Sequence, residues 1–230
     1  MGSSLVRETD SVPASQDTAT LRQIFAAITP ESCPGSYNFH MHTICSDGRL
    51  TPETLIGQAI ALGLKGLAIT DHHAVGGFRR AQQWLKNHAP ASPPHLWTGV
   101  EITARLLQSD VHILGYAIDP AQPQLQPYLQ GQGVQGDASQ AHRVITAIQA
   151  AGGIAVLAHP ARYPDPSAAL IPAAAALGID GVETYYAYNN PNPWQPSPRQ
   201  TREIFTLGEY HGLLHTCGTD THGLNLLHRM

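Results

Sequence analysis

The sequence is poor in lysine and in charge of either sign. Only Lys65 and Lys86 represent lysine among its 230 residues, and lysine and arginine together number 13 against 17 acidic residues, giving a formal net charge of −4. Proteins that bind chiefly to the backbone of long nucleic acids neutralise many phosphates with such cations, so this class is excluded. Charged residues make up 13% of the chain while 42% of it is hydrophobic. Intrinsic disorder is excluded too, because it combines low hydrophobicity with high charge.

Cysteine and long apolar runs are also scarce. The three cysteines, Cys33, Cys45 and Cys217, are an odd number and form no C-x-x-C pair, so we expect reduced thiols rather than a disulfide framework. No run approaches the ~20 apolar residues of a membrane helix. The first residues, MGSSLVRETDSV, lack the apolar segment of a secretory signal. These absences predict a cytoplasmic protein that does not enter the membrane.

From Tyr37 onward, strand-like and helix-like segments alternate. The predicted strands are 37–43, 65–70, 96–103, 111–118, 154–158, 181–185 and 213–218. The predicted helices are 52–62, 75–88, 138–151, 166–177 and 198–211, the first of them with Thr51 as N-cap and Pro52 at its first position. Residues 1–36 are predicted to be an N-terminal tail with a short helix at 18–28, ahead of one domain at 37–230. The alternation indicates an α/β fold with a largely parallel sheet.

The 13 histidines equal lysine and arginine combined, and six of them follow or lie in predicted strands. Side chains at i and i+2 of a strand point to the same face, as His40 and His42 do, and the ends of parallel strands in a barrel converge on one mouth. The candidate ligands at these positions are His40, His42, Asp47, His72, Glu101, His112, His159, Asp220 and His222. Imidazole mixed with carboxylate suits Mn²⁺, Zn²⁺ or Fe²⁺.

A single histidine at a strand end is more often a hydrogen-bonded structural residue than a ligand. We retain that interpretation for the remaining histidines, which are His73, His88, His95, His142, His211, His215 and His228. It does not account for an H-x-H pair, a D-x-H pair and three further histidines at separate strand ends. Burying so many polar groups without a partner costs several kcal/mol each, so the sequence favours a metal centre.

Six motifs in this order resemble the polymerase and histidinol phosphatase (PHP) family of metal-dependent phosphoesterases. They are NFHMHTICSDG, ITDHH, GVEI, HILGY, AHPAR and GTDTH, and they cover roughly Tyr37 to Gly223. Within the family, the chain is most similar to the nucleotide-phosphoesterase branch, whose members remove phosphate from nucleoside 3′,5′-bisphosphates or trim short RNA from the 5′ end. The resemblance implies a distorted seven-stranded TIM-like β/α barrel with three divalent ions, most often Mn²⁺, with Fe²⁺ or Zn²⁺ as alternatives.

The resemblance also implies a ligand set for each ion. The first ion takes His40, His42, Glu101 and Asp220, the second shares Glu101 and adds His112 and His159, and the third takes Asp47, His72 and His222. The chain departs from the family pattern in three places. His73 stands where Asp or Asn is common, Thr219 replaces a common Ser, and the helical insertion before the AHP strand is reduced to residues 119–136, which puts substrate specificity in question.

The expected mechanism is hydrolysis of a phosphomonoester by a hydroxide that bridges two ions. The residues predicted to carry catalysis are Glu101 as the bridging carboxylate, Asp220 as the group that orients the nucleophile, His222 beside the third ion, and Arg162 as a phosphate clamp. A surface salt bridge is an equally weighted alternative for Arg162. Asp71 is expected to orient an imidazole; Glu183 either does the same or faces solvent.

The aromatic residues Tyr185, Tyr186, Tyr188 and Trp194 either stack a nucleobase or pack in the core. The leading prediction is therefore a phosphoesterase for a nucleotide or a short oligonucleotide, with no long duplex and no membrane as partner. Two alternatives stay open, a histidinol-phosphate-like phosphatase for small metabolites and a non-catalytic metal-binding regulatory module. The oligomeric state is left open.

Overall fold

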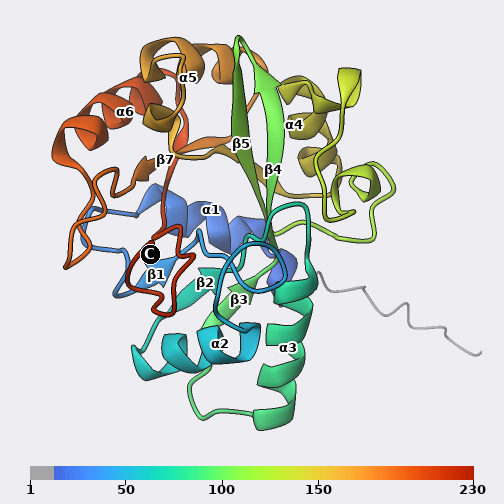
Figure 1. Ribbon diagram of the computed structural model, residues 1–230, viewed down its shortest axis with the longest axis vertical. Helices are drawn as coiled ribbons and strands as arrows, with labels where there is room; N and C mark the ends of the chain where they lie inside the picture. Colours follow the sequence, from blue (N-terminus) through green and yellow to red (C-terminus); the bar gives the residue numbers. More distant parts are fainter. Residues whose placement is uncertain (1–12) are drawn as a thin grey trace, which may run out of the picture.

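The strands form two sheets in the computed structural model, which describes residues 13–230 (Figure 1). The smaller sheet is parallel and has the order β1 (Tyr37–Asn38), β2 (Gly66–Ala68) and β3 (His95–Trp97). The larger sheet has the order β4 (Gly99–Leu106), β5 (Ser109–Tyr116), β6 (Ile154–Leu157), β7 (Gly181–Tyr185) and β8 (Leu214–Cys217). It is mixed, because β5 runs antiparallel to both β4 and β6 while β6, β7 and β8 are parallel.

The predicted distorted seven-stranded barrel is therefore wrong, because the strands form two separate sheets. The expectation of mainly parallel pairing holds except at β5, whose two pairings are antiparallel. The segment 96–103, predicted as one strand, contains parts of two strands, because the chain leaves β3 at Thr98 and enters β4 in the other sheet. Residues 107–108 then turn the chain back into an antiparallel hairpin, with Leu107 at φ 54°. Hydrophobicity could not reveal this reversal, since a strand buried on both faces has the same composition in either direction.

Isolated backbone pairings connect the two sheets next to the strand ends. Met41, just after β1, pairs with Thr221, just after β8, and His72, after β2, pairs with Glu101 of β4. His42 N donates to the carbonyl oxygen of Thr221 at 3.0 Å, and Glu101 N donates to that of Asp71 at 3.2 Å. The polar residues predicted to lie together are therefore placed by backbone contacts between the sheets.

Six α-helices accompany the strands, at the positions that the sequence pattern predicts within a few residues. They are α1 (Thr18–Ala26), α2 (Pro52–Ala61), α3 (Gly76–His88), α4 (Ala141–Ala150), α5 (Ser167–Ala176) and α6 (Pro198–Tyr210). The hydroxyl of Thr51 caps α2 by accepting from Thr54 N at 3.1 Å, as predicted. No helix among residues 13–230 is both long and apolar enough to cross a membrane.

The helices pack on different parts of the molecule (Figure 1). Residues of α4 and α5 share one apolar cluster with the β4–β5 hairpin, and residues of α2 and α3 share another with β2. Helix α1 packs on residues of both sheets, because Phe25 lies in a cluster with Trp97 of β3 and Tyr116 of β5. The short helix ahead of Tyr37 is thus built into the core. The first part of the predicted tail, residues 1–12, lies outside the described residues.

Candidate metal centre

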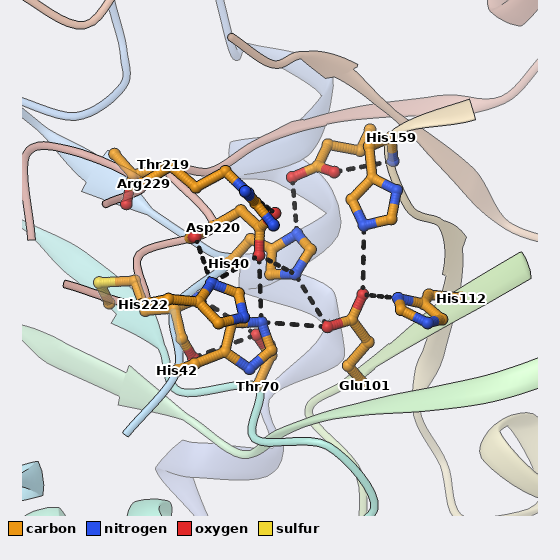
Figure 2. Close-up of polar contacts among 12 residues, drawn as sticks. His40, His42, Thr70, Glu101, His112, His159, Thr219, Asp220, His222 and Arg229 are labelled. Carbon is orange, nitrogen blue, oxygen red and sulfur yellow. Dashed lines mark hydrogen bonds and ion pairs between the residues drawn. The ribbon is translucent and has the colours of Figure 1, made fainter. Parts of the chain in front are cut away.

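Four buried side chains form the inner part of the candidate centre, which we call the inner group: His40, His42, Glu101 and Asp220. The two histidines follow β1, Glu101 belongs to β4, and Asp220 follows β8. Nε2 of His42 lies 3.1 Å from Glu101 Oε2 and 3.2 Å from Asp220 Oδ1, and Nε2 of His40 lies 3.1 Å from the same Glu101 oxygen. Figure 2 shows these side chains facing one another. All four are at most 2% exposed.

The two carboxylate oxygens of Glu101 face different imidazoles. Oε2 faces His40 and His42, whereas Oε1 lies 2.8 Å from Nδ1 of His112 and 3.4 Å from Nε2 of His159. His112 comes from β5 and His159 follows β6. Because one carboxylate lies between two sets of imidazoles, its geometry suits a ligand shared by two neighbouring ions.

The outer part of the centre, the outer group, consists of Asp47, His72 and His222 around His42. Asp47 Oδ2 lies 3.2 Å from Nε2 of His222 and 3.7 Å from Nε2 of His72. These three residues reach solvent, with exposed side-chain fractions of 55% for Asp47, 25% for His72 and 15% for His222. All nine side chains predicted as ligands are thus brought together, in groups whose ligand atoms lie within 4.8 Å of one another.

The hydrogen bonding of the imidazoles fits bound cations. His40 Nδ1 lies 3.0 Å from Glu183 Oε1, and His222 Nδ1 lies 2.8 Å from the carbonyl oxygen of Asp220. In each ring Nδ1 therefore donates, which directs Nε2 toward the carboxylates; metal-bound histidines commonly show this arrangement. Nδ1 of His42 and Nδ1 of His159 are buried without a hydrogen-bond partner among residues 13–230. Such orphaned nitrogens are costly unless a further group binds there.

The carboxylates and imidazoles perturb one another strongly. Burial works against the charged form of His42, but the neighbouring carboxylates of Asp220 and Glu101 outweigh it and raise its pKa to about 9. Burial likewise works against ionisation of Glu101, yet His40 and His112 hold the pKa of Glu101 well below its ordinary value. In the protein without metal, protons on the inner histidines therefore balance the carboxylates, and a cation must displace them to bind.

Asp220 has a different environment at each carboxylate oxygen. Oδ1 faces the inner histidines, while Oδ2 accepts hydrogen bonds from Tyr186 Oη at 2.7 Å, Arg229 Nε at 2.8 Å and Arg162 Nη1 at 2.9 Å. Arg162, predicted as a phosphate clamp, is thus held beside the candidate centre by its hydrogen bond to Asp220. Its other guanidinium nitrogens make no hydrogen bond to residues 13–230. Sequence reasoning missed Arg229, because nothing in the segment after the GTDTH motif signals that it folds back.

The segment that carries Arg229 is anchored at several points. The side-chain amide of Gln58 donates to the carbonyl oxygen of Leu224 and accepts from Leu226 N. Leu226 is fully buried, and its carbonyl oxygen accepts from Asn38 and Thr219. These contacts hold residues 223–230 beside the centre, which brings Arg229 to Asp220.

Three of the seven non-glycine residues with positive φ among residues 13–230 lie at the centre. His73, His159 and Asp220 have φ values of 51°, 27° and 53°, which residues other than glycine rarely adopt. Each belongs to or adjoins a predicted ligand position. Such strain persists only where the surroundings enforce it, and it gathers at functional sites.

Other expectations had mixed outcomes. Asp71 contacts no imidazole; its carboxylate accepts from Thr43 N at 2.7 Å and from the hydroxyl of Ser46 at 2.8 Å. It thereby holds the loop that carries Asp47. Glu183 is fully buried rather than solvent-facing, and it also accepts from His159 N at 2.8 Å.

Three of the four aromatic residues on and after β7 pack in the core, since Tyr185, Tyr186 and Trp194 are at most 7% exposed. Tyr188 is partly buried, and its hydroxyl accepts from Ala161 N at 3.2 Å. Burial raises the pKa of Tyr186, and so does the adjacent Asp220, which keeps its hydroxyl a donor to that carboxylate. His73, retained as a structural residue, is hydrogen-bonded, with its Nε2 accepting from Thr103 N at 3.2 Å.

Comparison with known proteins places these features in a family. A model described as the PHP domain matches residues 38–159. The chain is 36% identical over 104 residues to the 5′-3′ exoribonuclease Rnm of Salmonella typhimurium, an alignment that covers 45% of this chain and 35% of that protein. It is 40% identical over 88 residues to the 3′,5′-nucleoside bisphosphate phosphatase of Chromobacterium violaceum, covering 38% and 30% respectively. The matched region thus spans about a third of these relatives.

Solved structures resemble the fold over a larger part of the chain. An amidohydrolase from Chromobacterium violaceum superposes with a TM-score of 0.68 at 23% identity, covering 82% of this chain and 88% of that one. A protein from Bifidobacterium adolescentis, described provisionally as a metal-dependent phosphoesterase, superposes with a TM-score of 0.67 at 24% identity, covering 83% and 88%. At these identities the likeness establishes the fold.

Proposed function

The chain belongs to the PHP domain family, and from this premise we propose that it is a metal-dependent phosphoesterase that hydrolyses phosphomonoesters of nucleotides. The candidate substrates are a nucleoside 3′,5′-bisphosphate and the 5′ end of a short RNA, the substrate types named for two of its relatives. The observation that carries the proposal is Glu101, whose two oxygens face separate sets of imidazoles. The domain assigned to this activity is 37–230, which contains every proposed ligand.

Three divalent ions, most often Mn²⁺, are proposed to bind the nine ligands. The inner group supports the first site and the outer group supports the third. The contacts of Glu101 Oε1 to His112 and His159 support the second. When bound, such ions stabilise negative charge on phosphoryl oxygens and lower the pKa of coordinated water. Mixed imidazole and carboxylate donors suit Mn²⁺, Fe²⁺ or Zn²⁺.

The protein's own residues position these groups. Asp220 is proposed to orient the nucleophile through Oδ1, because Tyr186, Arg162 and Arg229 together fix Oδ2. Glu183 keeps Nε2 of His40 directed inward by accepting from Nδ1. Arg162 is 37% exposed, so its unengaged guanidinium nitrogens are accessible to a phosphoryl oxygen, and a planar guanidinium suits two such oxygens.

A substrate screen tests the proposal. Protein reconstituted with Mn²⁺ is assayed on adenosine 3′,5′-bisphosphate, 5′-phosphorylated dinucleotides, mononucleotides and histidinol phosphate, with an EDTA-treated sample beside it. We expect phosphate release from nucleotides that EDTA abolishes and about three metal ions per chain by elemental analysis. Asp220→Asn should retain metal but lose at least about a hundredfold in kcat, the scale of removing one charge-stabilising group.

The outcomes of the screen separate the alternatives. Preference for histidinol phosphate would replace the nucleotide proposal with a small-metabolite phosphatase. Absence of turnover on every ester, with metal bound, would overturn the enzymatic proposal and favour a metal-binding module.

A further inference from the structure

An apolar cavity of about 370 Å³ lies between the first part of α6 and the end of β7. Its walls include the rings of Tyr185 and Phe205 and three prolines, Pro30, Pro196 and Pro198. The volume is within the range of pockets that hold small molecules, which are mostly apolar and have a few polar groups. The polar groups of this cavity therefore indicate which molecule it suits.

The cavity is separate from the candidate centre. Tyr185 lines the cavity, whereas the next residue, Tyr186, donates its hydroxyl hydrogen bond to Asp220 Oδ2. Consecutive side chains of an extended chain point to opposite faces, which accounts for this division. None of the nine proposed metal ligands lines the cavity, so a molecule bound there does not occupy the metal site.

Three polar groups of the lining residues have no partner among residues 13–230. Oγ1 of Thr201 is buried there without a hydrogen bond, and the hydroxyl of Tyr185 makes none with the described residues although Tyr185 is only 4% exposed. The guanidinium of Arg202 likewise makes no hydrogen bond or ion pair within this part of the chain; only its carbonyl oxygen is used, by Thr206. Buried polar groups almost always have a partner, so an acceptor in the cavity would supply one.

The charge of the lining favours an anionic acceptor. Among residues 13–230, Arg202 is the only charged side chain that lines the cavity. Burial raises the pKa of Tyr185, and the carboxylates of Glu31 and Glu209 raise it further, so its hydroxyl stays a donor. Neither carboxylate lines the cavity, and Glu209 is paired with Nε2 of His215 at 3.0 Å. One cation and two hydroxyl donors thus stand among apolar rings.

We propose that this cavity binds a small aromatic monocarboxylate. The rings of Tyr185 and Phe205 contact its apolar body, and Arg202 with the hydroxyls of Thr201 and Tyr185 bind its carboxylate. A guanidinium and hydroxyl donors suit carboxylate oxygens, and hydrogen bonds to a charged group are the stronger kind. This binding needs neither a bound metal nor hydrolytic activity, so it is tested independently of the proposed function.

The first test is the binding of 2-naphthoate to the full chain, with 2-naphthamide as the uncharged counterpart. EDTA-treated protein is used so that the carboxylate has no metal to bind. We expect a Kd on the order of 100 µM for 2-naphthoate, typical of a ligand with about 13 non-hydrogen atoms, and about tenfold weaker binding of the amide. In an NMR titration the backbone amides of residues 201–205 should shift most. Shifts confined to the candidate centre, or no saturable binding, would overturn the proposal.

Arg202→Ala tests the contact with the carboxylate. The Kd for 2-naphthoate should rise about tenfold, the effect of losing one charge-assisted hydrogen bond, while the Kd for 2-naphthamide stays unchanged. Arg199→Ala is the matched control, because Arg199 lies three residues earlier on α6 and lines a different cavity. Equal affinity of wild type and Arg202→Ala for 2-naphthoate would contradict the proposal.

Thr201→Val distinguishes a binding role from a folding role. The change replaces a hydroxyl that has no partner among residues 13–230 by a methyl group, so the Tm of the ligand-free protein should not fall. The Kd for 2-naphthoate should rise about fivefold through the lost hydrogen bond. A lower Tm with an unchanged Kd would show that the hydroxyl serves the fold, against the proposed contact.

A second copy of the chain is the competing occupant, because Phe205 is 40% exposed. Sedimentation of ligand-free wild type and of Phe205→Ser separates the two. A monomeric wild type supports a small molecule as the occupant. A dimer that Phe205→Ser dissociates would assign the cavity to a subunit interface and overturn the proposal.

Discussion

The inner and outer groups of the candidate centre both combine imidazoles with carboxylates, but the inner group is buried and the outer group reaches solvent. His40, His42, Glu101 and Asp220 are almost fully buried, whereas Asp47 is more than half exposed and His222 and His72 reach solvent. Charges in a buried site are screened less and interact more strongly. The inner group should therefore hold its ions tightly, and the outer group should hold one that exchanges readily.

The largest effect should come from Glu101, the inner-group carboxylate whose two oxygens face separate sets of imidazoles. Glu101→Gln removes a negative charge contacted by both inner histidines and by His112. We expect at least about a thousandfold loss of kcat/KM, because each bound ion stabilises the transition state by several kcal/mol, together with loss of most bound metal by elemental analysis. Glu53→Gln, at an exposed carboxylate paired with Arg80, is the control. Retention of all metal by Glu101→Gln would refute the bridging role.

Asp47→Ala should weaken metal binding by the outer group without weakening metal binding by the inner group. The side chain is exposed, and it contacts the outer histidines, His42 Nδ1 and the hydroxyl of Ser46, so the fold should remain stable. We expect loss of about one metal equivalent and roughly a hundredfold lower kcat/KM, with the other ions still bound. Asp110→Ala, at an exposed acid in a surface pair with Arg105, should change neither quantity. Loss of all metal in Asp47→Ala would show that the two groups do not differ in affinity.

Arg229→Ala tests how the inner group is supported. Arg229 donates to Asp220 Oδ2 from outside the proposed ligand set, and removal of such supporting contacts typically costs 10–100-fold in activity or metal affinity. We expect kcat to fall about thirtyfold, and added guanidinium to restore part of it. His228→Ala, on the neighbouring residue, is the control. Unchanged kcat in Arg229→Ala would assign Arg229 a purely structural role.

The smallest expected effect is on the pH dependence of stability. The pKa of His42 is raised from 6.5 to about 9 in the folded protein. Its stabilising contribution is therefore fully present below pH 6.5 and is lost as the pH rises through 9. The shift corresponds to about 3 kcal/mol, so EDTA-treated protein should lose on the order of 10 °C of Tm between pH 6.5 and 9.5, at 2–4 °C per kcal/mol for a chain of this size.

Bound metal should reverse the change of Tm with pH that is expected for EDTA-treated protein. A bound ion requires a deprotonated imidazole, so metal-loaded protein should become more stable as the pH rises over the same range. Melting curves with and without EDTA at matched ionic strength measure the difference. Parallel slopes in the two samples would mean that the inner histidines are not protonated in the metal-free protein.

The sequence indicated which side chains lie close together better than it predicted the sheet topology. Spacing along a strand determines the direction of a side chain. The H-x-H and D-x-H pairs could therefore be recognised from neighbouring residues alone, which grouped His40 with His42 and Asp220 with His222. The antiparallel hairpin β4–β5 could not be predicted, because strand direction depends on the partner rather than on composition. Arg229 was missed for a related reason, since its approach to Asp220 depends on the docking of Leu226.

The anchored segment 223–230 has a consequence for the order in which the protein is made. His40, the first proposed ligand, is synthesised long before Asp220 and Arg229. Partly synthesised chains therefore present H-x-H without the carboxylates that complete the inner group. The hydrogen bond from Arg229 to Asp220 forms last, because it needs segment 223–230 to dock against Gln58.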